Sequence, residues 1–354
     1  MRIAQVAPLY ISVPPKLSGG TERVVSYLTE ELVAQGHEVT LFASGDSETR
    51  AKLVSVCPQA LCQAKNYLDA RPHFQRMMEL VFEDVSRFDV IHFHTDFQFP
   101  LLRSQPCTNV TTWHMSLGPR QKAFFDEYKL PLVSISDNQR LPMLEANWQA
   151  TIYHGLPRDL YTFRKEPGDY LAFIGRPSVN KRLDLAVRVA CQAKMKLKVA
   201  AQINPEDQYY KQYVKPLLNE AQDWVEFIGE VGGREKDEFL GNAHALLFPI
   251  AWPEPFGLVM IESLACGTPV IAWRNGSVPE VIHDGRTGFI VESVDEAVQA
   301  VARVSGLNRE TCHQIFEERF DAARMTHEYV KVYQRLASLS SKQTETEQLS
   351  GESC

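Results

Sequence analysis

The sequence predicts an α/β protein made of two doubly wound parallel sheets in tandem. The chain of 354 residues is long enough for two domains of ordinary size. Its 44% of hydrophobic residues allow each half to bury a core of its own. Both halves also open with the same order of elements, namely a strand, a loop, a helix and a second strand. That order is typical of a parallel sheet covered by helices.

The N-terminal half shows this order clearly. Residues 2–7 form a run that is typical of a strand, and a loop rich in Pro and Gly follows it. Thr21 is a suitable N-cap for the next helix, whose apolar residues recur at helical spacing until Gly36 ends it. Residues 39–43 then predict the second strand. Further strands are expected at residues 89–94, 110–113 and 132–135.

The pattern pauses at residues 153–168, where Gly and Pro accumulate. We therefore place the domain boundary there, with an N-terminal domain over residues 1–160 and a second domain over residues 165–311. The second domain repeats the order of elements, with a strand at 170–174 and a helix at 183–193. Later strands are expected at residues 197–201, 225–228, 245–249, 269–273 and 287–291.

The C-terminal end of the chain changes character twice. Helical patterns are present at residues 294–304 and 311–336. From about residue 338 the chain becomes polar and loses its periodicity, so residues 338–354 are predicted to be a disordered tail.

Composition and charge exclude several classes of protein. A net charge of −7 argues against a nucleic-acid binder and against more than peripheral contact with an anionic membrane. The seven cysteines are scattered and form no Cys-x-x-Cys pair, which fits reduced thiols in the cytoplasm. The apolar run before Pro8 is too short for a signal peptide, and no stretch is long enough to span a membrane.

Two carboxylates eight positions apart mark the most informative stretch of the sequence. Glu254 follows an expected buried strand, and Glu262 falls in the helix that begins near residues 256–259. The free N–H groups of a helix start favour a phosphate or the oxygens of a sugar, and carboxylates accept hydrogen bonds from hydroxyl groups. The alternative is that Glu254 is a cap and Glu262 a solvated helix residue.

A basic turn follows the first strand of the second domain. Arg176, Lys181 and Arg182 lie within seven residues, an arrangement that fits a phosphate clamp or, alternatively, a solvated loop. The sequence contains neither Gly-x-Gly-x-x-Gly nor a P-loop motif, which argues against dehydrogenases and NTPases. Near the N-terminus, Gly19 and Gly20 would let the backbone approach a ligand closely.

Histidines gather in the N-terminal domain. His92, His94 and Asp96 share one strand face, but no fourth ligand is evident, so we expect structural histidines rather than a metal site. There is no Asp-x-Asp pair for a nucleotide-bound divalent metal ion. His114 follows the strand at 110–113 and should therefore lie at a strand's C-terminal end, where ligands bind.

Taken together, the order and spacing of these motifs resemble family 4 of the retaining glycosyltransferases, over about residues 1–336. The resemblance implies the GT-B fold, in which two Rossmann-like domains face each other. The loop at residues 11–15 is similar to that of a subgroup that includes an avilamycin-type antibiotic glycosyltransferase. The segments that carry the resemblance are residues 14–25, 36–40, 174–181, 254–272, 276–282 and 287–288.

The resemblance implies roles for individual residues. Arg176 and Lys181 would grip the donor diphosphate, Glu254 would bind hydroxyls of the transferred sugar, and His114 would face that sugar near the reacting carbon. Glu262 would bind the donor ribose. The remaining donor-binding positions implied by the resemblance are Gly20, Phe256, Gly257, Leu258 and Glu280.

The resemblance also implies an activity. The chain would transfer a hexose-type sugar from a nucleoside diphosphate sugar, UDP before GDP, to an acceptor hydroxyl with retention of configuration. It would need no metal ion and no cofactor, and its last helix, at 312–336, would cross back to the N-terminal domain. The acceptor would be a sugar, a lipid-linked sugar or a small molecule. Alternatives are a GT-B nucleotide-sugar epimerase and a non-catalytic sugar-nucleotide binder.

Overall fold

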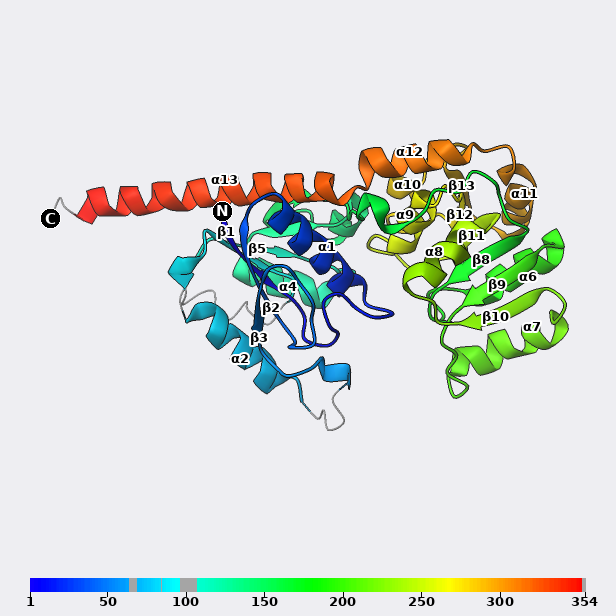
Figure 1. Ribbon diagram of the computed structural model, residues 1–354, viewed down its shortest axis with the longest axis horizontal. Coiled ribbons are helices and arrows are strands. Elements are labelled where there is room, and N and C mark those ends of the chain that lie inside the picture. Colours follow the sequence, from blue (N-terminus) through cyan, green and yellow to red (C-terminus); the bar gives the residue numbers. More distant parts are fainter. Residues whose placement is uncertain (64–68, 84, 96–106, 352–354) are drawn as a thin grey trace. The chain divides into compact units, whose positions relative to one another are not determined.

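A computed structural model describes residues 1–63, 69–83, 85–95 and 107–351, without the side chains of Arg120, Phe124 and residues 340–351. The chain folds into two compact units. Unit 1 comprises Met1–Ile135, Arg140–Gly155 and the chain from Ala322 onwards, and unit 2 comprises Ser136–Gln139 and Leu156–Asp321. Figure 1 shows both as sheets covered by helices, which is the α/β architecture that the sequence predicts.

Within its described residues, unit 1 contains a seven-stranded parallel sheet in the order β3-β2-β1-β4-β5-β6-β7. The strand order reverses between β1 and β4, so the loops that follow these two strands mark the switch point where α/β sheets bind ligands. The strands are β1 (Arg2–Val6), β2 (Glu38–Ala43), β3 (Lys52–Ser55), β4 (Val90–Phe93), β5 (Asn109–Thr112), β6 (Leu132–Ser134) and β7 (Trp148–Thr151).

The helices of unit 1 cover this sheet with apolar faces. Val24, Val25, Leu28 and Leu32 of α1 are buried, as their helical spacing predicts, and Gly36 follows the helix with φ +84°. Helix α13 packs against α1 and β4, so the end of the chain completes unit 1 (Figure 1). The helices are α1 (Gly20–Ala34), α2 (Arg71–Phe82), α4 (Pro119–Tyr128) and α13 (Ala322–Gly351); the short α5 (Asp137–Arg140) spans the division between the units.

The described residues of unit 2 form a six-stranded parallel sheet in the order β10-β9-β8-β11-β12-β13. Here the order reverses between β8 and β11. The strands are β8 (Tyr170–Ile174), β9 (Lys196–Ala200), β10 (Val225–Gly229), β11 (Ala245–Phe248), β12 (Val270–Trp273) and β13 (Gly288–Val291).

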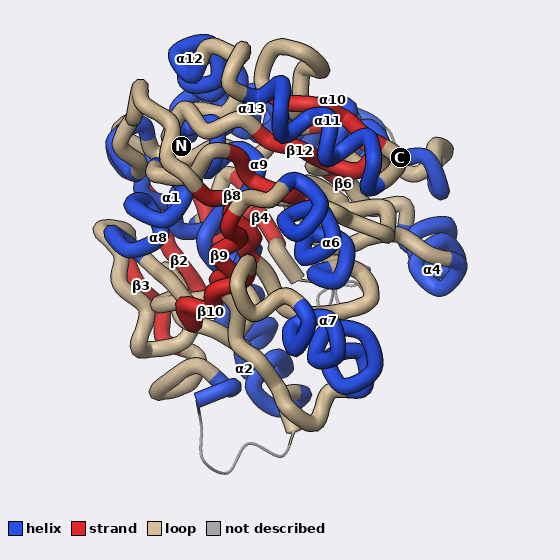
Figure 2. Tube along the Cα trace, turned by 90° about the vertical axis from the view of Figure 1, so that its right-hand side faces the viewer, coloured by secondary structure: helices blue, strands red, loops and turns tan. Residues whose placement is uncertain are grey.

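The helices of unit 2 lie on both faces of the sheet. Figure 2 shows α6 and α7 beside β9 and β10, and their apolar residues share one core with β8 and β9. The helices are α6 (Leu183–Ala193), α7 (Lys215–Glu220), α8 (Gly233–Gly241), α9 (Leu258–Ala265), α10 (Val278–Val281), α11 (Val294–Val304) and α12 (Arg309–Arg319).

The observed limits of the units differ from the predicted domains near the C-terminus. The sequence pattern predicts one helix over 311–336, but α12 ends at Arg319 and α13 begins at Ala322. The two helices are separated at Phe320 and Asp321, where the Leu156 N–H donates to the Phe320 carbonyl at 2.8 Å and Asp321 pairs with Arg158. Therefore α12 belongs to unit 2, and the return to unit 1 begins at Ala322 rather than at residue 312.

The tail also differs from the prediction of disorder. Helix α13 extends to Gly351. Adding residues to an existing helix is easier than nucleating a new one, so a polar segment continues a helix that tertiary contacts have started. Within the described residues, no helix combines the length and apolar character that crossing a bilayer requires.

Candidate active site

The basic turn of unit 2 follows β8 at the switch point of the sheet. Gly175 begins it with φ +145°, a conformation that favours glycine. The N–H groups of Lys181 and Arg182 then donate to the Ser178 carbonyl at 3.1 and 3.0 Å, which closes the turn before α6. The turn therefore presents its side chains at the carboxyl end of the sheet.

The three cations of this turn have different surroundings. Arg182 forms a bidentate ion pair with Asp184, in the first turn of α6, with both contacts at 2.8 Å. Its charge is therefore paired within the protein. Lys181 Nζ lies 2.7 Å from Glu254 Oε2. Arg176 is exposed, and its guanidinium makes no hydrogen bond or ion pair with any residue that the structure describes. Arg176 is thus the cation most available to a ligand.

Glu254 lies in the loop after β11, which two neighbouring segments hold in place. The Ala251 N–H donates to the Asn180 carbonyl at 2.9 Å, and the Ser277 N–H donates to the Glu254 carbonyl at 3.0 Å. Gly276 lies so close that a Cβ atom there would come within 2.3 Å of the Glu254 backbone. The loop is therefore fixed against the basic turn on one side and against the turn after β12 on the other.

The Glu254 carboxylate makes two hydrogen bonds through one oxygen. Oε2 accepts from Lys181 Nζ and from Trp252 Nε1, both at 2.7 Å. The Glu254 side chain is only 13% exposed, so this charge is partly desolvated and directed by its donors. Within the described residues, Oε1 makes no such bond and is available to a ligand hydroxyl.

Helix α9 begins directly beyond this loop. Gly257 precedes it with φ +79°, and a Cβ atom there would lie 2.9 Å from Met260 Cε and 3.1 Å from Phe248 Cζ. Phe256 is buried, and its carbonyl accepts from Ser277 Oγ at 2.7 Å. The Met260 N–H donates to the Gly257 carbonyl at 3.0 Å. The N–H groups of Leu258 and Val259, at the start of the helix, have no partner within it and are suited to polar oxygens.

Glu262 is buried in α9 rather than solvated, so the alternative interpretation as a surface residue is wrong. Its side chain is 2% exposed, and Lys236 Nζ of α8 lies 2.5 Å from Oε2. Lys236 could not be predicted as a site residue, because it stands among other charged residues of α8 with no motif around it. The ion pair with Lys236 orients the Glu262 carboxylate in a buried position.

Glu280 accepts hydrogen bonds from the polypeptide itself. Its Oε2 accepts from the Asp137 N–H at 2.7 Å, and its Oε1 accepts from the Asn138 N–H at 2.8 Å. Both donors lie in Ser136–Gln139, the short segment that belongs to unit 2. The arrangement fastens this segment, so the contacts of Glu280 in the ligand-free chain are structural.

The two remaining candidates lie in unit 1. Gly20 is exposed at the start of α1, but the tight position is Gly19, where φ is +143° and a Cβ atom would lie 2.8 Å from Pro15 Cβ. His114 is half-buried after β5, and its Nε2 lies 2.9 Å from Nδ1 of His94. Burial lowers the pKa of His114 to about 3, so its imidazole is neutral at physiological pH.

Two family models match the chain over these segments. The model of glycosyl transferases group 1 matches residues 162–318, and that of glycosyltransferase family 4 matches residues 18–141. The chain belongs to the family 4 glycosyltransferases. The first match contains the basic turn and both carboxylates, and the second contains Gly20 and His114.

Curated relatives of this glycosyltransferase match it over very different lengths. A D-inositol 3-phosphate glycosyltransferase of Streptomyces scabiei is 44% identical over 84 residues, which cover 24% of this chain and 18% of the relative. A phosphatidyl-myo-inositol mannosyltransferase of Mycobacterium leprae is 23% identical over 97% of this chain and 99% of the relative. The chain thus spans less than a fifth of the first relative and nearly all of the second.

Solved structures show that this glycosyltransferase has the GT-B fold. AviGT4, described as a glycosyltransferase involved in avilamycin A biosynthesis, superposes with a TM-score of 0.73 at 24% identity. The superposition covers 95% of this chain and 98% of AviGT4. Anabaena Alr3699/HepE, solved in complex with UDP and glucose, gives a TM-score of 0.70 at 17% identity over 96% of this chain and all of that chain.

His92 and His94 make hydrogen bonds through their ring nitrogens with protein groups of unit 1. Asp96 lies outside the described residues. Among the residues that the structure describes, no group of three or more His, Cys, Asp or Glu side chains could hold a metal ion.

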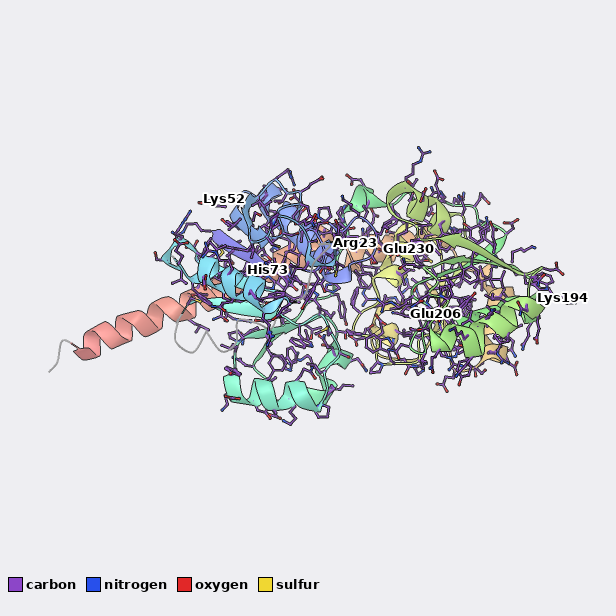
Figure 3. All side chains as sticks on the ribbon, turned by 90° about the horizontal axis from the view of Figure 1, so that it is seen from below. Arg23, Lys52, His73, Lys194, Glu206 and Glu230 are labelled. Atoms are coloured by element: carbon purple, nitrogen blue, oxygen red, sulfur yellow. The ribbon has the colours of Figure 1, made fainter. Side chains whose placement is uncertain are left out.

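Helix α2 is an amphipathic helix whose buried face packs on the core of unit 1. Met77 and Met78 are buried in the core, whereas Arg76 pairs with Glu79 on the surface. His73, also on α2, is labelled in Figure 3. These contacts give α2 a packing role in unit 1.

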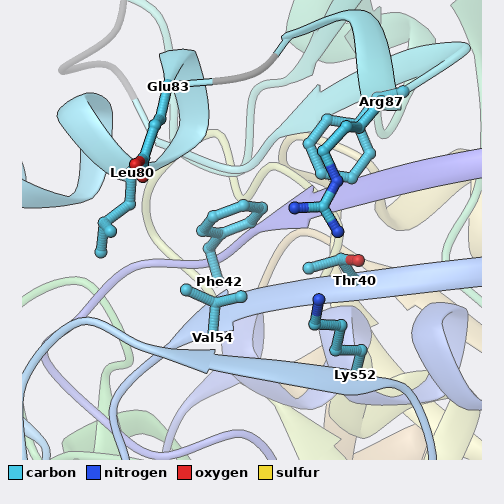
Figure 4. Close-up of a pocket in the computed structure, with 8 residues that line it drawn as sticks. Thr40, Phe42, Lys52, Val54, Leu80, Glu83 and Arg87 are labelled. Carbon is cyan, nitrogen blue, oxygen red and sulfur yellow. The ribbon is translucent and has the colours of Figure 1, made fainter.

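A pocket of about 310 Å³ lies in unit 1 away from the predicted residues. Phe42, Val54 and Leu80 form its apolar wall, and Lys52 and Arg87 bring cations to its other side (Figure 4). None of the candidate catalytic or donor-binding residues predicted from the sequence lines this pocket.

Proposed function

We propose that this glycosyltransferase transfers a hexose-type sugar from a nucleoside diphosphate sugar to an acceptor hydroxyl, with retention and without a metal ion. The single observation that carries the proposal is the contact between Lys181 and Glu254 at 2.7 Å. It places a cation suited to a diphosphate beside a carboxylate suited to sugar hydroxyls, at the switch point between β8 and β11.

The donor would lie along the carboxyl end of the unit 2 sheet. Arg176 and Lys181 bind the diphosphate, while Glu254 Oε1 and the N–H groups at the start of α9 bind the sugar. Glu262, held by Lys236, accepts hydrogen bonds from the ribose hydroxyls. UDP is favoured and GDP is the next choice; the complex of Alr3699/HepE with UDP and glucose supports UDP.

The reaction would begin when the bond from the anomeric carbon to the diphosphate breaks and its electron pair leaves with the diphosphate. The sugar passes through an oxocarbenium-like state. The acceptor oxygen attacks from the same face, and an oxygen of the departing phosphate takes the acceptor's proton. Arg176, Lys181 and the positive end of α9 stabilise the charge on the diphosphate.

His114 would serve this reaction as a neutral group. A histidine with a pKa of about 3 carries no charge near pH 7, so it contributes a hydrogen bond to the sugar and does not repel the oxocarbenium-like state. The free cysteines among the described residues support action in the cytoplasm. The proposed reaction uses the donor as co-substrate and needs no cofactor.

The decisive experiment measures binding and transfer separately. UDP, GDP, ADP and TDP and their glucose, galactose and mannose conjugates are first tested for thermal stabilisation, with Lys181→Ala and Glu262→Ala as controls. A ligand at 100 times its Kd adds about 2.7 kcal/mol of stability, which shifts the melting temperature by a few degrees. The donor found is then incubated with a panel of glycosides, and the product's anomeric configuration is read by NMR.

Each outcome has one meaning. A product of retained configuration that requires acceptor supports the proposal. Conversion of the donor sugar without acceptor would instead indicate an epimerase, and binding without turnover would indicate a sugar-nucleotide binder. An inverted product, or activity that is abolished by EDTA and restored by a divalent metal ion, would overturn retention or metal independence.

A further inference from the structure

A chain of buried polar side chains connects helix α13 to His114 in unit 1. Gln5 Oε1 lies 2.8 Å from His94 Nε2, and His94 Nδ1 lies 2.9 Å from His114 Nε2. On the other side, Gln5 Nε2 donates to the Tyr333 hydroxyl at 3.2 Å. Gln5 and Tyr333 are fully buried, so their polar atoms depend on one another for hydrogen bonds.

The chain continues beyond Tyr333 to a second tyrosine of α13. The Tyr333 hydroxyl lies 2.6 Å from His92 Nδ1, and His92 Nε2 lies 2.8 Å from Thr112 Oγ1. Thr112 Oγ1 in turn lies 2.9 Å from the Tyr329 hydroxyl. Every ring nitrogen of His92 and His94 is therefore used, and neither residue has a role in the donor site proposed above.

The orientation of the Gln5 amide determines where the protons lie. A neutral histidine has one N–H and one nitrogen lone pair. Because Gln5 Oε1 can only accept, His94 must carry its proton on Nε2 and accept on Nδ1. His114 must then donate from Nε2, which leaves the lone pair on Nδ1.

The opposite arrangement requires the amide to rotate. Its NH2 group would then donate to His94 Nε2, the proton of His94 would move to Nδ1, and His114 would carry its proton on Nδ1. In that state the Gln5 oxygen would accept from Tyr333. Within the described residues, the direction of these hydrogen bonds is therefore set where the Gln5 amide meets the Tyr333 hydroxyl.

We propose that Gln5 and Tyr333 are positioning residues that fix the tautomer of His114, so that its Nδ1 accepts a hydrogen bond from a hydroxyl of the substrate. His114 is half-buried, and its Nδ1 makes no hydrogen bond with the residues that the structure describes. The site thereby selects a substrate group that can donate a hydrogen bond to Nδ1. A hydroxyl can do this, whereas a fluorine or methoxy group cannot. The substrate part of this inference rests on the proposed function.

The tautomer itself is tested in the ligand-free protein. Two-bond 15N–1H correlation NMR on protein labelled with 15N-histidine shows which ring nitrogen carries the proton, and His114→Gln assigns the signals. We expect the proton of His114 on Nε2 in the wild type. In Tyr333→Phe and Gln5→Met the contact between the Gln5 amide and the Tyr333 hydroxyl is lost, and both tautomers are expected.

Tyr329→Phe is the matched control. It also removes a tyrosine hydroxyl from α13, but at the end of the hydrogen-bonded series that lies farthest from His114. It should leave the His114 tautomer as in the wild type. A wild-type proton on Nδ1, or a tautomer that does not change in Tyr333→Phe, would overturn the proposal. Tyr333→Phe answers the question even where Gln5→Met fails to fold.

A kinetic measurement then tests the selection. For each hydroxyl of the donor sugar, kcat/KM is measured for the normal donor and for the analogue in which fluorine replaces that hydroxyl. At one position, the ratio of the two values should be about fivefold lower in Tyr333→Phe than in the wild type. In Tyr329→Phe the ratio should be the same as in the wild type. If no donor is turned over, the proposed function fails while the NMR result still stands. If transfer occurs but no position shows this fall, the inferred selection is wrong.

Discussion

Lys181 Nζ lies 2.7 Å from Glu254 Oε2, although the two residues are 73 positions apart in the chain. The proposed roles send them to different parts of one donor, the lysine to the diphosphate and the glutamate to the sugar. Their contact means that neither side chain has to travel far when a donor binds. Donor binding would also weaken the ion pair between the two side chains, so their contributions to the binding free energy should be coupled.

Lys181→Ala tests the role of this cation. We expect turnover to fall about 100-fold or more, because a charge that stabilises the departing diphosphate is lost. The loss should appear mainly in kcat. Lys194→Ala, which removes an exposed lysine of the same unit, should change kcat less than twofold. Activity of Lys181→Ala within threefold of the wild type would contradict the role.

Lys236→Met tests the buried pair behind the ribose-binding carboxylate. The change leaves the Glu262 charge buried without its partner, so the free energy of unfolding should drop by about 3 kcal/mol. Arg234→Met, on the same helix, breaks the exposed pair with Glu238 and should cost less than about 0.5 kcal/mol. Urea unfolding measures both, and equal effects would show that burial of the first pair is unimportant.

Gly257→Ala tests how the start of α9 is formed. The new methyl group would lie too close to Met260 and Phe248, and the alanine would have to adopt a left-handed backbone conformation. Both the free energy of unfolding and the affinity for the donor should therefore fall. Gly285→Ala is the control, because Gly285 has φ +71° but open space around it. The control should show only the backbone cost of about 1 kcal/mol. A Gly257→Ala protein that matches it in stability and in donor Kd would refute the steric argument.

Acidic pH should destabilise unit 1 earlier than carboxylate titration alone predicts. Burial lowers the pKa of His92, His94 and His154 well below 6.5, and Arg324 lowers that of His154 further. These histidines are neutral when folded and become protonated on unfolding below pH 6.5. Their contribution is therefore complete above that pH and declines as the pH falls, by up to about 1.4 kcal/mol per pH unit for each residue.

Urea unfolding at pH 7.5 and at pH 5.5 measures this loss, in a window above the titration of ordinary carboxylates. His154→Gln should reduce the dependence on pH, whereas His327→Gln, at an exposed position, should leave it unchanged. Equal stability of the wild type at both pH values would rule out the histidines as the cause.

Much of the fold could be predicted because the local pattern and the tertiary structure agree. The apolar spacing of α1 and the Gly36 stop both describe the helix that forms. The break between α12 and α13 could not be predicted, since the apolar pattern continues through Phe320. What interrupts it is a hydrogen bond from Leu156, more than 160 residues earlier in the chain.

The candidate site divides in the same way. Glu254, Glu262 and Lys181 stand out because their motifs combine chemistry with a strand-to-helix turn. Their partners Trp252 and Lys236 have no motif, because a hydrogen-bond donor needs only to reach the carboxylate and many sequence positions allow that. The sequence pattern groups Arg182 with the phosphate-binding cations, but in the structure Arg182 forms an ion pair with Asp184, two residues later.

The division of unit 1 along the chain has a consequence for synthesis. Residues 156–321 can leave the ribosome and fold while unit 1 still lacks α13. Until then, the face of α1 that α13 covers is open to water, and His92 has no Tyr333 to bond. The first unit to be translated is thus the last to be finished, and a chain that stops before Ala322 should carry one folded half and one that is prone to aggregate.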